Sequence, residues 1–225
     1  MNKSLAFAIM AVVIIATFQL LRPAGEPPRA IDGLPWQIET LANGGSRVFG
    51  LELSHSTLDA ARVRFGEDLE IGILAARDEA GSLEVYFNSV TAGVITGKMI
   101  LVAALDDTTL AGLRARSIRK KQLDATTYQY VLDADDLPLA WRAPIASITF
   151  IPAASLDAET VLKRFGTPQE RLRTSDGLEH FLYPEKGLDL TLDNKGKEVL
   201  QYVAPREFAR LREPLRQGGI PTNGR

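Results

Sequence analysis

This chain of 225 residues contains no cysteine. That absence excludes disulfide bonds, thiolate nucleophiles and cysteine-ligated metals, and it leaves no residue for the lipid attachment of a bacterial lipoprotein. Histidine is scarce, since only His55 and His180 are present. Neither lies at metal-ligand spacing from another histidine, so both are predicted to have structural roles, at the surface or half-buried.

The chain also lacks a strong charge of either sign, because its formal net charge is -2. Such a surface creates no overall field that favours nucleic acid or an acidic ligand. The hydrophobic content of 45% and the charged content of 24% are ordinary for a globular protein. The composition therefore indicates a globular chain, with room for one or two domains.

Long apolar runs are missing except at the N-terminus, where residues 5–21 read LAFAIMAVVIIATFQLL. As a helix, this run is about 25 Å long, near the lower limit for crossing a bilayer. A cleaved signal peptide is the alternative, but cleavage after Ala24 would place Arg22 where a small residue is preferred. We therefore predict an uncleaved signal anchor, a transmembrane helix over residues 1–22 that lies in the inner membrane.

The flanks of this run carry positive charge on both sides, with Lys3 before it and Arg22 and Arg29 after it. Charge therefore does not set the orientation, and the bulk of the chain is placed on the periplasmic side because short N-terminal anchors commonly act as export signals. Residues 23–35 are rich in proline and glycine and are predicted to form a linker. Residues 217–225 are predicted to form a disordered tail.

The tripeptide Arg-Phe-Gly occurs at residues 64–66 and again at residues 164–166. Each copy follows a good helix N-cap, Thr57 or Asp157, and each ends in a glycine that suits a helix C-cap. The phenylalanine of each copy is expected to pack into a core. The repeat thus predicts the same capped helix in two copies of one structural unit.

Sequences typical of strands surround both helices. Alternating or β-branched stretches predict strands at residues 47–53, 83–87, 99–105, 126–132, 145–151 and 178–183. Residues 188–203 alternate on both sides of residues 193–196, which predicts a hairpin with a turn there. Gly97 and Lys98 are predicted to form the equivalent turn of the first copy. Two further helices are predicted at residues 106–117 and 205–216.

These elements predict an α+β fold of two tandem modules, preceded by one transmembrane helix. Each module is a helix packed on a three- or four-stranded antiparallel sheet. The first module is predicted at residues 36–118 and the second at residues 137–216, with a connector that contains a strand at residues 119–136.

The second copy contains DAETVLKRFGTP at residues 157–168, then the strand LEHFLY and a hairpin with Gly196 and Lys197. This pattern resembles the BamE (SmpA/OmlA) family of small outer-membrane assembly lipoproteins, over residues 145–205 and more loosely over residues 45–105. That family is similar to the repeat of β-lactamase inhibitor protein, where helices pack on an antiparallel sheet. The resemblance implies a non-catalytic envelope module that binds other proteins. The chain departs from the family in lacking the lipid-attachment cysteine and in having two copies.

Patterns that suggest chemistry are incomplete. Residues 93–98 resemble a phosphate-binding loop, but the spacing is one residue short and Met99 replaces the hydroxyl residue that would hold magnesium. Ser117 and Lys120 have the Ser-x-x-Lys spacing of penicillin-binding enzymes without the other elements of that site. No catalytic, cofactor-binding or metal-binding residue is therefore predicted.

Two charged clusters remain. Asp133, Asp135 and Asp136 lack the distal glutamate of a calcium loop and are predicted to form a solvated turn. The basic cluster consists of Arg114, Arg116, Arg119, Lys120 and Lys121. It is predicted to be a solvated helix end, and weak contact with anionic lipid is the alternative.

The function predicted from these features is that of a membrane-anchored envelope protein, a non-catalytic interaction or assembly scaffold. Envelope proteins are its predicted partners, without nucleic acid and without a cofactor. Two alternatives stay open: an enzyme of hydrolase type with an unrecognised site between the modules, and a sensor domain for a small ligand.

Overall fold

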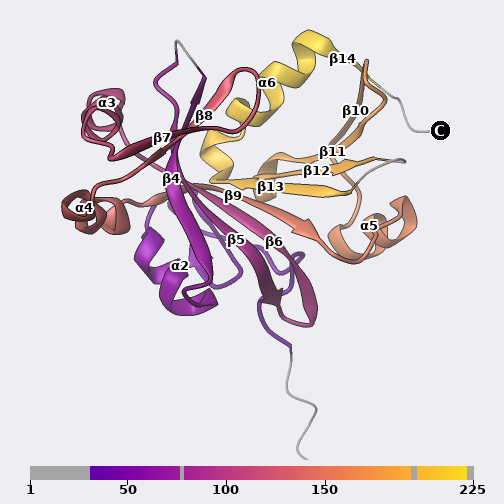
Figure 1. Cartoon of the computed structure of the whole chain (residues 1–225). Helices are drawn as coiled ribbons and strands as arrows, with labels where there is room; N and C mark the ends of the chain where they lie inside the picture. The colour runs from indigo at the N-terminus through magenta and orange to yellow at the C-terminus, as the bar shows by residue number, and fades with distance from the viewer. Residues whose placement is uncertain (1–30, 77–78, 194–196, 222–225) are drawn as a thin grey trace, which may run out of the picture. The chain divides into compact units, whose positions relative to one another are not determined.

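The computed structural model describes residues 31–76, 79–193 and 197–221. The chain divides into residues 1–31 and a second compact unit that begins at Asp32. All the strands and helices described below belong to this second unit (Figure 1). The predicted membrane helix at residues 5–21 lies outside the described residues, and within them no helix is both long and apolar enough to span a bilayer.

An eleven-stranded sheet dominates the unit, and every neighbouring pair of its strands is antiparallel. From one edge to the other the strands are β14 (Gly219–Pro221), β10 (Glu170–Thr174), β11 (Glu179–Tyr183), β12 (Leu188–Leu192), β13 (Val199–Val203), β9 (Ile145–Pro152), β6 (Ile95–Ala103), β5 (Ser82–Ala92), β4 (Leu69–Ala76), β8 (Thr127–Val131) and β7 (Arg119–Gln122). A second, small sheet consists of β1 (Glu39–Thr40), β2 (Ser46–Val48) and β3 (Leu51–Glu52).

The prediction of two tandem modules, each a helix on a three- or four-stranded sheet, is wrong, and whether their sheets join was left open by the sequence. Strand β9 pairs with β13 of the second half on one side and with β6 of the first half on the other, so one sheet crosses the predicted boundary. The strand predicted inside the connector is β8, which lies between β4 and the edge strand β7 of the same sheet. The period-two alternation of side chains identifies each strand. It does not say which neighbouring strand forms hydrogen bonds with the backbone N–H and C=O groups along its edges.

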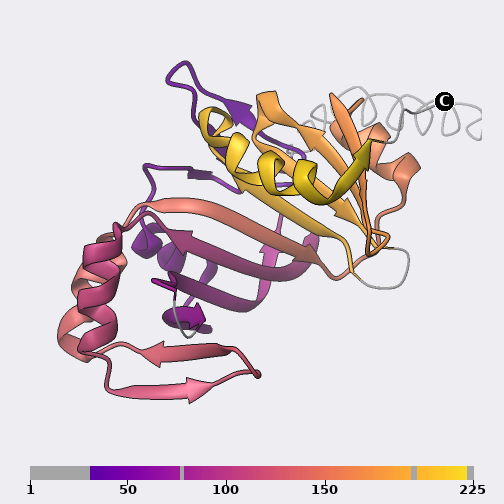
Figure 2. The ribbon, with the colours of Figure 1, turned by 90° about the horizontal axis from the view of Figure 1, so that it is seen from above.

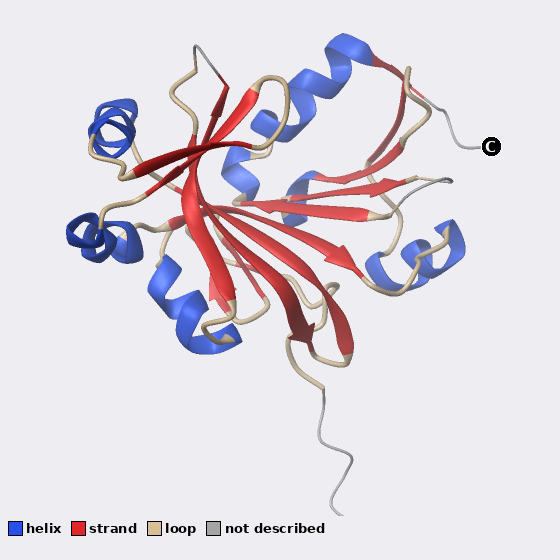
Figure 3. Cartoon of the chain, in the orientation of Figure 1, coloured by secondary structure: helices blue, strands red, loops and turns tan. Residues whose placement is uncertain are grey.

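The helices surround this sheet (Figure 3). They are α2 (Leu58–Phe65), α3 (Asp107–Ala115), α4 (Leu137–Arg142), α5 (Ala158–Phe165) and α6 (Ala209–Gly218). Three single 3-10 turns accompany them: η1 (Ala134–Asp136), η2 (Pro184–Lys186) and η3 (Pro205–Glu207). The helix predicted at residues 106–117 is confirmed as α3, and the one predicted at residues 205–216 begins as η3 and continues as α6.

The predicted ends of the two repeated helices are confirmed. The Thr57 side chain accepts a hydrogen bond from the Ala60 amide at 3.2 Å, and Asp157 accepts one from the Thr160 amide at 2.7 Å. Both helices end at a glycine with positive φ, 97° at Gly66 and 85° at Gly166. A residue with a Cβ adopts this conformation only with strain, which explains the glycine of each tripeptide.

The phenylalanines of the tripeptides also have matching environments. Phe65 packs edge-on against Phe87 with ring centroids 5.8 Å apart, and Phe165 packs against Tyr183 at 6.2 Å. The arginines reach the small sheet and the segment that precedes it. The Arg164 guanidinium lies 4.7 Å from the centre of the Trp36 ring, and the Arg64 guanidinium covers Gly50.

Most strand predictions are confirmed, but two details are wrong. Residues 47–53 form parts of β2 and β3, joined by a turn at Phe49 and Gly50 with φ values of 55° and 76°. Positive φ is costly for phenylalanine, but its ring is buried 5.3 Å from both Phe150 and Tyr202, so tertiary packing holds the turn. The second error concerns Gly97 and Lys98, which lie inside β6, because the hairpin turns at Gly93 instead.

The two faces of the large sheet differ in what covers them. We call the face that carries the main hydrophobic core the core face; the small sheet and helices α2, α3, α4 and α5 all contribute to that core. Helix α6 packs on the opposite face through a smaller cluster that contains Leu172, Leu182, Val203 and Phe208. Figure 2 shows α6 lying across the strands of the second half. The strands of the first half present the same face of the sheet, but the cluster under α6 does not extend over them.

Candidate functional site

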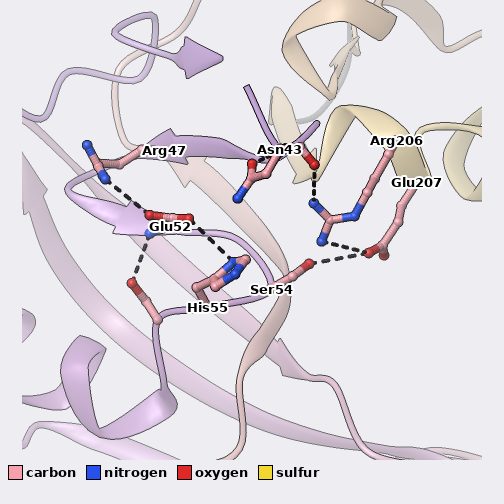
Figure 4. Close-up of polar contacts among 9 residues, drawn as sticks. Asn43, Arg47, Glu52, Ser54, His55, Arg206 and Glu207 are labelled. Atoms are coloured by element: carbon pink, nitrogen blue, oxygen red, sulfur yellow. Dashed lines mark hydrogen bonds and ion pairs between the residues drawn. The ribbon is translucent and has the colours of Figure 1, made fainter. Parts of the chain in front are cut away.

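The two histidines lie in different settings, and neither joins a catalytic arrangement. His55 follows β3 at the surface, where its Nδ1 lies 3.4 Å from Glu52 Oε1 (Figure 4). The adjacent Ser54 hydroxyl donates to Glu207 Oε1 at 3.3 Å, so the serine is not engaged by the histidine as a nucleophile would be. Arg47 and Arg206 complete this surface network through further carboxylate contacts.

His180 on β11 is buried more deeply than the sequence predicts, with 6% of its surface exposed. Its Nδ1 lies 3.0 and 3.1 Å from the carboxylate oxygens of Asp189 and 3.2 Å from the Thr191 hydroxyl. Because a carboxylate only accepts hydrogen bonds, Nδ1 donates to Asp189. This buried cluster lies on the sheet face that α6 covers and opens into none of the pockets described below, so we assign it a structural role.

The acidic cluster forms local contacts. Asp133 caps the 3-10 turn η1 by accepting from the Asp135 amide at 3.0 Å, and Asp136 receives a two-pronged ion pair from Arg116 at 2.7 to 3.1 Å. Within the described ranges, no group of three or more histidine, aspartate or glutamate side chains is placed to hold a metal ion. Ser117 follows α3 and Lys120 lies on β7, so the Ser-x-x-Lys pair has no helical frame.

The basic cluster is split between the end of α3 and the edge strand β7, so its interpretation as a helix end is only partly correct. Arg114 donates to the Glu79 carbonyl at 2.6 Å, and Lys120 lies over the Tyr128 ring at 3.7 Å. All four residues of β7 are exposed. Positive charge on an edge strand prevents it from pairing with strands of other molecules. This role explains the lysines of β7, and no ligand is needed to account for them.

Tyr183 supports the end of helix α5 and has a strongly shifted pKa. Its hydroxyl donates to the Gly166 carbonyl at 2.9 Å, and the nearby Lys186 ammonium donates to the Phe165 carbonyl. Burial raises the pKa of Tyr183 from 10.0 to about 12, because the phenolate is poorly solvated there. The neutral phenol is therefore part of the folded structure.

We expect the stability contributed by this phenol to be complete below pH 10 and to be lost as the pH rises from about 10 to about 12. The sign follows from the raised folded-state pKa, because the unfolded chain releases the proton first. Tyr183→Phe should remove this part of the alkaline loss and should cost about 1 kcal/mol at neutral pH, through the lost hydrogen bond to Gly166. Urea unfolding of both proteins between pH 8 and pH 11.5 measures the difference; parallel pH profiles would refute the assignment.

The feature that calls for a functional explanation is the part of the sheet that no described helix packs on. Along β5, β6 and β9, buried side chains on the core face alternate with exposed or half-buried side chains on the other face. We call this second surface the open face. It is formed by Glu70, Gly72 and Leu74 of β4, Glu84 and Tyr86 of β5, Lys98, Ile100 and Val102 of β6, and Ser147, Thr149 and Ile151 of β9.

The register places apolar and aromatic side chains at the centre of the open face. Ile100 lies directly between Tyr86 on β5 and Thr149 on β9, and Val102 lies between Glu84 and Ser147. Neighbouring strands are about 4.8 Å apart, so these side chains form continuous rows across the strands. The charged residues lie around this centre, since Glu70 is opposite Tyr86 at the end of the Ile100 row, and Glu84 and Lys98 lie in the rows on either side of it. An apolar centre with charged residues around it is typical of a surface that binds another protein.

The open face is hollowed where the sheet ends in β8 and β7. A pocket of about 190 Å³ is lined by residues of five neighbouring strands, including Tyr86, Ile100, Lys121 and Gln129. A shallow, partly apolar hollow of this size suits a protruding side chain better than a whole small molecule. The sequence did not identify the open face, because residues 99–103 of β6 read MILVA, a continuous apolar run that is also typical of a strand covered on both faces.

The chain matches no protein-family model, no curated protein and no solved structure.

Proposed function

We propose that this chain is a membrane-anchored envelope protein that acts as a non-catalytic interaction or assembly scaffold, and that the open face binds its protein partner. The observation that carries the proposal is the half-buried apolar row around Ile100, which lies on the sheet face where α6 covers only the second half. Sheet surfaces of soluble domains normally bury such rows under a second layer. A partner would supply that layer.

The chemistry of the open face agrees with a binding role. Tyr86 and the aliphatic side chains provide apolar area, while Ser147 and Thr149 offer hydroxyl groups that can pair with a partner's polar groups. The predicted anchor at residues 5–21 would attach the chain to the inner membrane, on the periplasmic side. The resemblance to BamE-type modules points to the same class of function. Weak anionic-lipid contact by the basic cluster stays a prediction of the sequence.

Site-specific photo-crosslinking in the native host tests the proposal. A photoreactive amino acid at Tyr86 or at Thr149 is expected to give one discrete adduct with an envelope protein. The matched control is Val63, which is 78% exposed on α2 and lies away from the open face. Equal adducts from Val63 and from the open face would contradict the proposal. An adduct with a second copy of this chain would replace it with self-assembly.

Binding of the purified partner then tests the apolar centre. Ile100→Asp places a charge in the middle of the row and is expected to weaken binding at least about tenfold, because a buried unpaired charge disfavours the complex. Circular dichroism must first show that the variant keeps its fold, since Ile100 is half-buried. An unchanged affinity in the folded variant would show that the partner binds elsewhere.

A further inference from the structure

Two lysines that are far apart in the sequence meet at the end of strand β9. Lys98 lies on β6, directly opposite Ile151 of β9, and Lys197 precedes β13. Both β6 and β13 run antiparallel to β9 and flank it, so the starts of these two strands lie beside the end of β9. The Lys197 ammonium donates to the Ala153 carbonyl at 3.1 Å, which holds it at this end of the sheet.

The two lysines line one pocket of about 510 Å³. This volume lies within the range of small-molecule sites. Ile151, Pro152 and Ala153 form its apolar part, and Asn88, Ser89 and Thr96 add amide and hydroxyl groups. A β-bulge between Phe87 and Val90 interrupts the pairing of β5 with β6, and it leaves Asn88 and Ser89 exposed at the pocket. Bulges often reposition side chains beside binding sites.

The charged side chains that line the pocket are both positive. None of the residues that line it is an aspartate or a glutamate. Among the ion pairs of the described residues, none involves Lys98 or Lys197. The chain as a whole has a net charge of -2, so general basicity does not explain this pair. Two unpaired ammonium groups at one pocket attract an anion.

We propose that this pocket binds a small organic anion. Its carboxylate or phosphate group lies between the ammonium groups of Lys98 and Lys197, where the Ser89 and Thr96 hydroxyls can also donate. Its apolar part lies on Ile151 and Pro152. This site lies at one end of the open face and shares Lys98 and Ile151 with it. Loss of anion binding with partner binding retained, or the reverse, distinguishes this proposal from the partner contact.

Titration calorimetry of the full-length chain in a non-ionic detergent tests the site with four probes: hexanoate, hexyl phosphate, inorganic phosphate and uncharged hexanol. At least one of the two hexyl anions is expected to bind about tenfold more tightly than hexanol and than inorganic phosphate, and comparing the two anions separates a carboxylate ligand from a phosphate ligand. Equal affinity for hexanol would overturn the role of the charge. Equal affinity for inorganic phosphate would overturn the role of the apolar part.

Two variants test the lysines directly. Lys98→Gln and Lys197→Gln are each expected to weaken binding of the hexyl anion about tenfold, since each removes one charged donor. Lys163→Gln, on the exposed surface of α5, is the matched control and is expected to leave the affinity unchanged. Both lysines of the pocket are exposed, so these variants should fold normally, as circular dichroism can verify. Unchanged binding in both folded variants would refute the site.

Discussion

Replacing Phe150 with alanine is expected to lower the free energy of unfolding by about 4 kcal/mol and to destabilise both halves of the sheet together. Phe150 is completely buried on β9, the strand that joins the halves, and its ring packs on Phe49. Removing the ring deletes contacts to β6 and β13 at once and leaves a cavity that the surrounding strands can fill only in part. Thr149→Ala, its neighbour on the open face, is the control and should cost well under that amount.

The two tryptophans allow each half to be followed separately in urea. Trp36 packs edge-on against Phe165 of α5, whereas Trp141 on α4 lies under the Arg62 guanidinium of α2 at 5.0 Å. The variant Trp36→Phe keeps Trp141, whose fluorescence reports on the first half through its contact with α2. The variant Trp141→Phe keeps Trp36, whose fluorescence reports on the second half through its contact with α5. Within each variant, the fluorescence transition is expected to coincide with the far-ultraviolet circular dichroism transition. Separate transitions would show that the halves unfold independently and would restore the interpretation as two modules.

Replacing Asp189 with alanine is the second change for which we expect a large effect, a loss of about 3 kcal/mol. The carboxylate is 1% exposed and is the acceptor for the His180 ring, so its removal leaves a buried donor without its main partner. Asp176→Ala is the matched control, because Asp176 bonds to Thr174 and Leu178 in an exposed turn of the same half. It should cost less than about 1 kcal/mol.

A double-mutant cycle with His180→Leu then measures the coupling between the two side chains. We expect the double variant to be more stable than the sum of the two single losses implies, since removing both partners leaves no orphaned polar group. Urea unfolding at neutral pH provides the measurement. If Asp189→Ala costs no more than Asp176→Ala, or if the cycle shows no coupling, then the pair does not stabilise the fold as described.

Local features of the fold follow directly from the sequence. The caps at Thr57 and Asp157 and the terminal glycines at Gly66 and Gly166 depend on contacts within one helix turn, so residue type and spacing are enough to predict them. The same holds for most strands, because period-two alternation reports directly that one face of a strand is buried. These predictions required no knowledge of the rest of the chain.

Features that depend on distant contacts could not be predicted in this way. The turn at Phe49 places a phenylalanine at positive φ, and only the rings of Phe150 and Tyr202 make that conformation acceptable. The burial of His180 depends on α6 covering its face of the sheet, and Asp189 becomes its partner only because β11 and β12 pair. The sequence prediction therefore placed the histidine correctly on a strand but underestimated its burial.

The sequence by itself determined the repeated capped helices, the strands around them and the scarcity of residues for metal or thiol chemistry, because each of these rests on residue type and short-range spacing. Only the tertiary structure decided that β9 joins β6 to β13 in one sheet, since side-chain periodicity shows which face of a strand is buried but not which strands become its neighbours. That pairing also leaves the open face exposed and brings Lys98 and Lys197 to one pocket. Both proposed binding surfaces therefore arise from strand order, a property that no short stretch of sequence encodes.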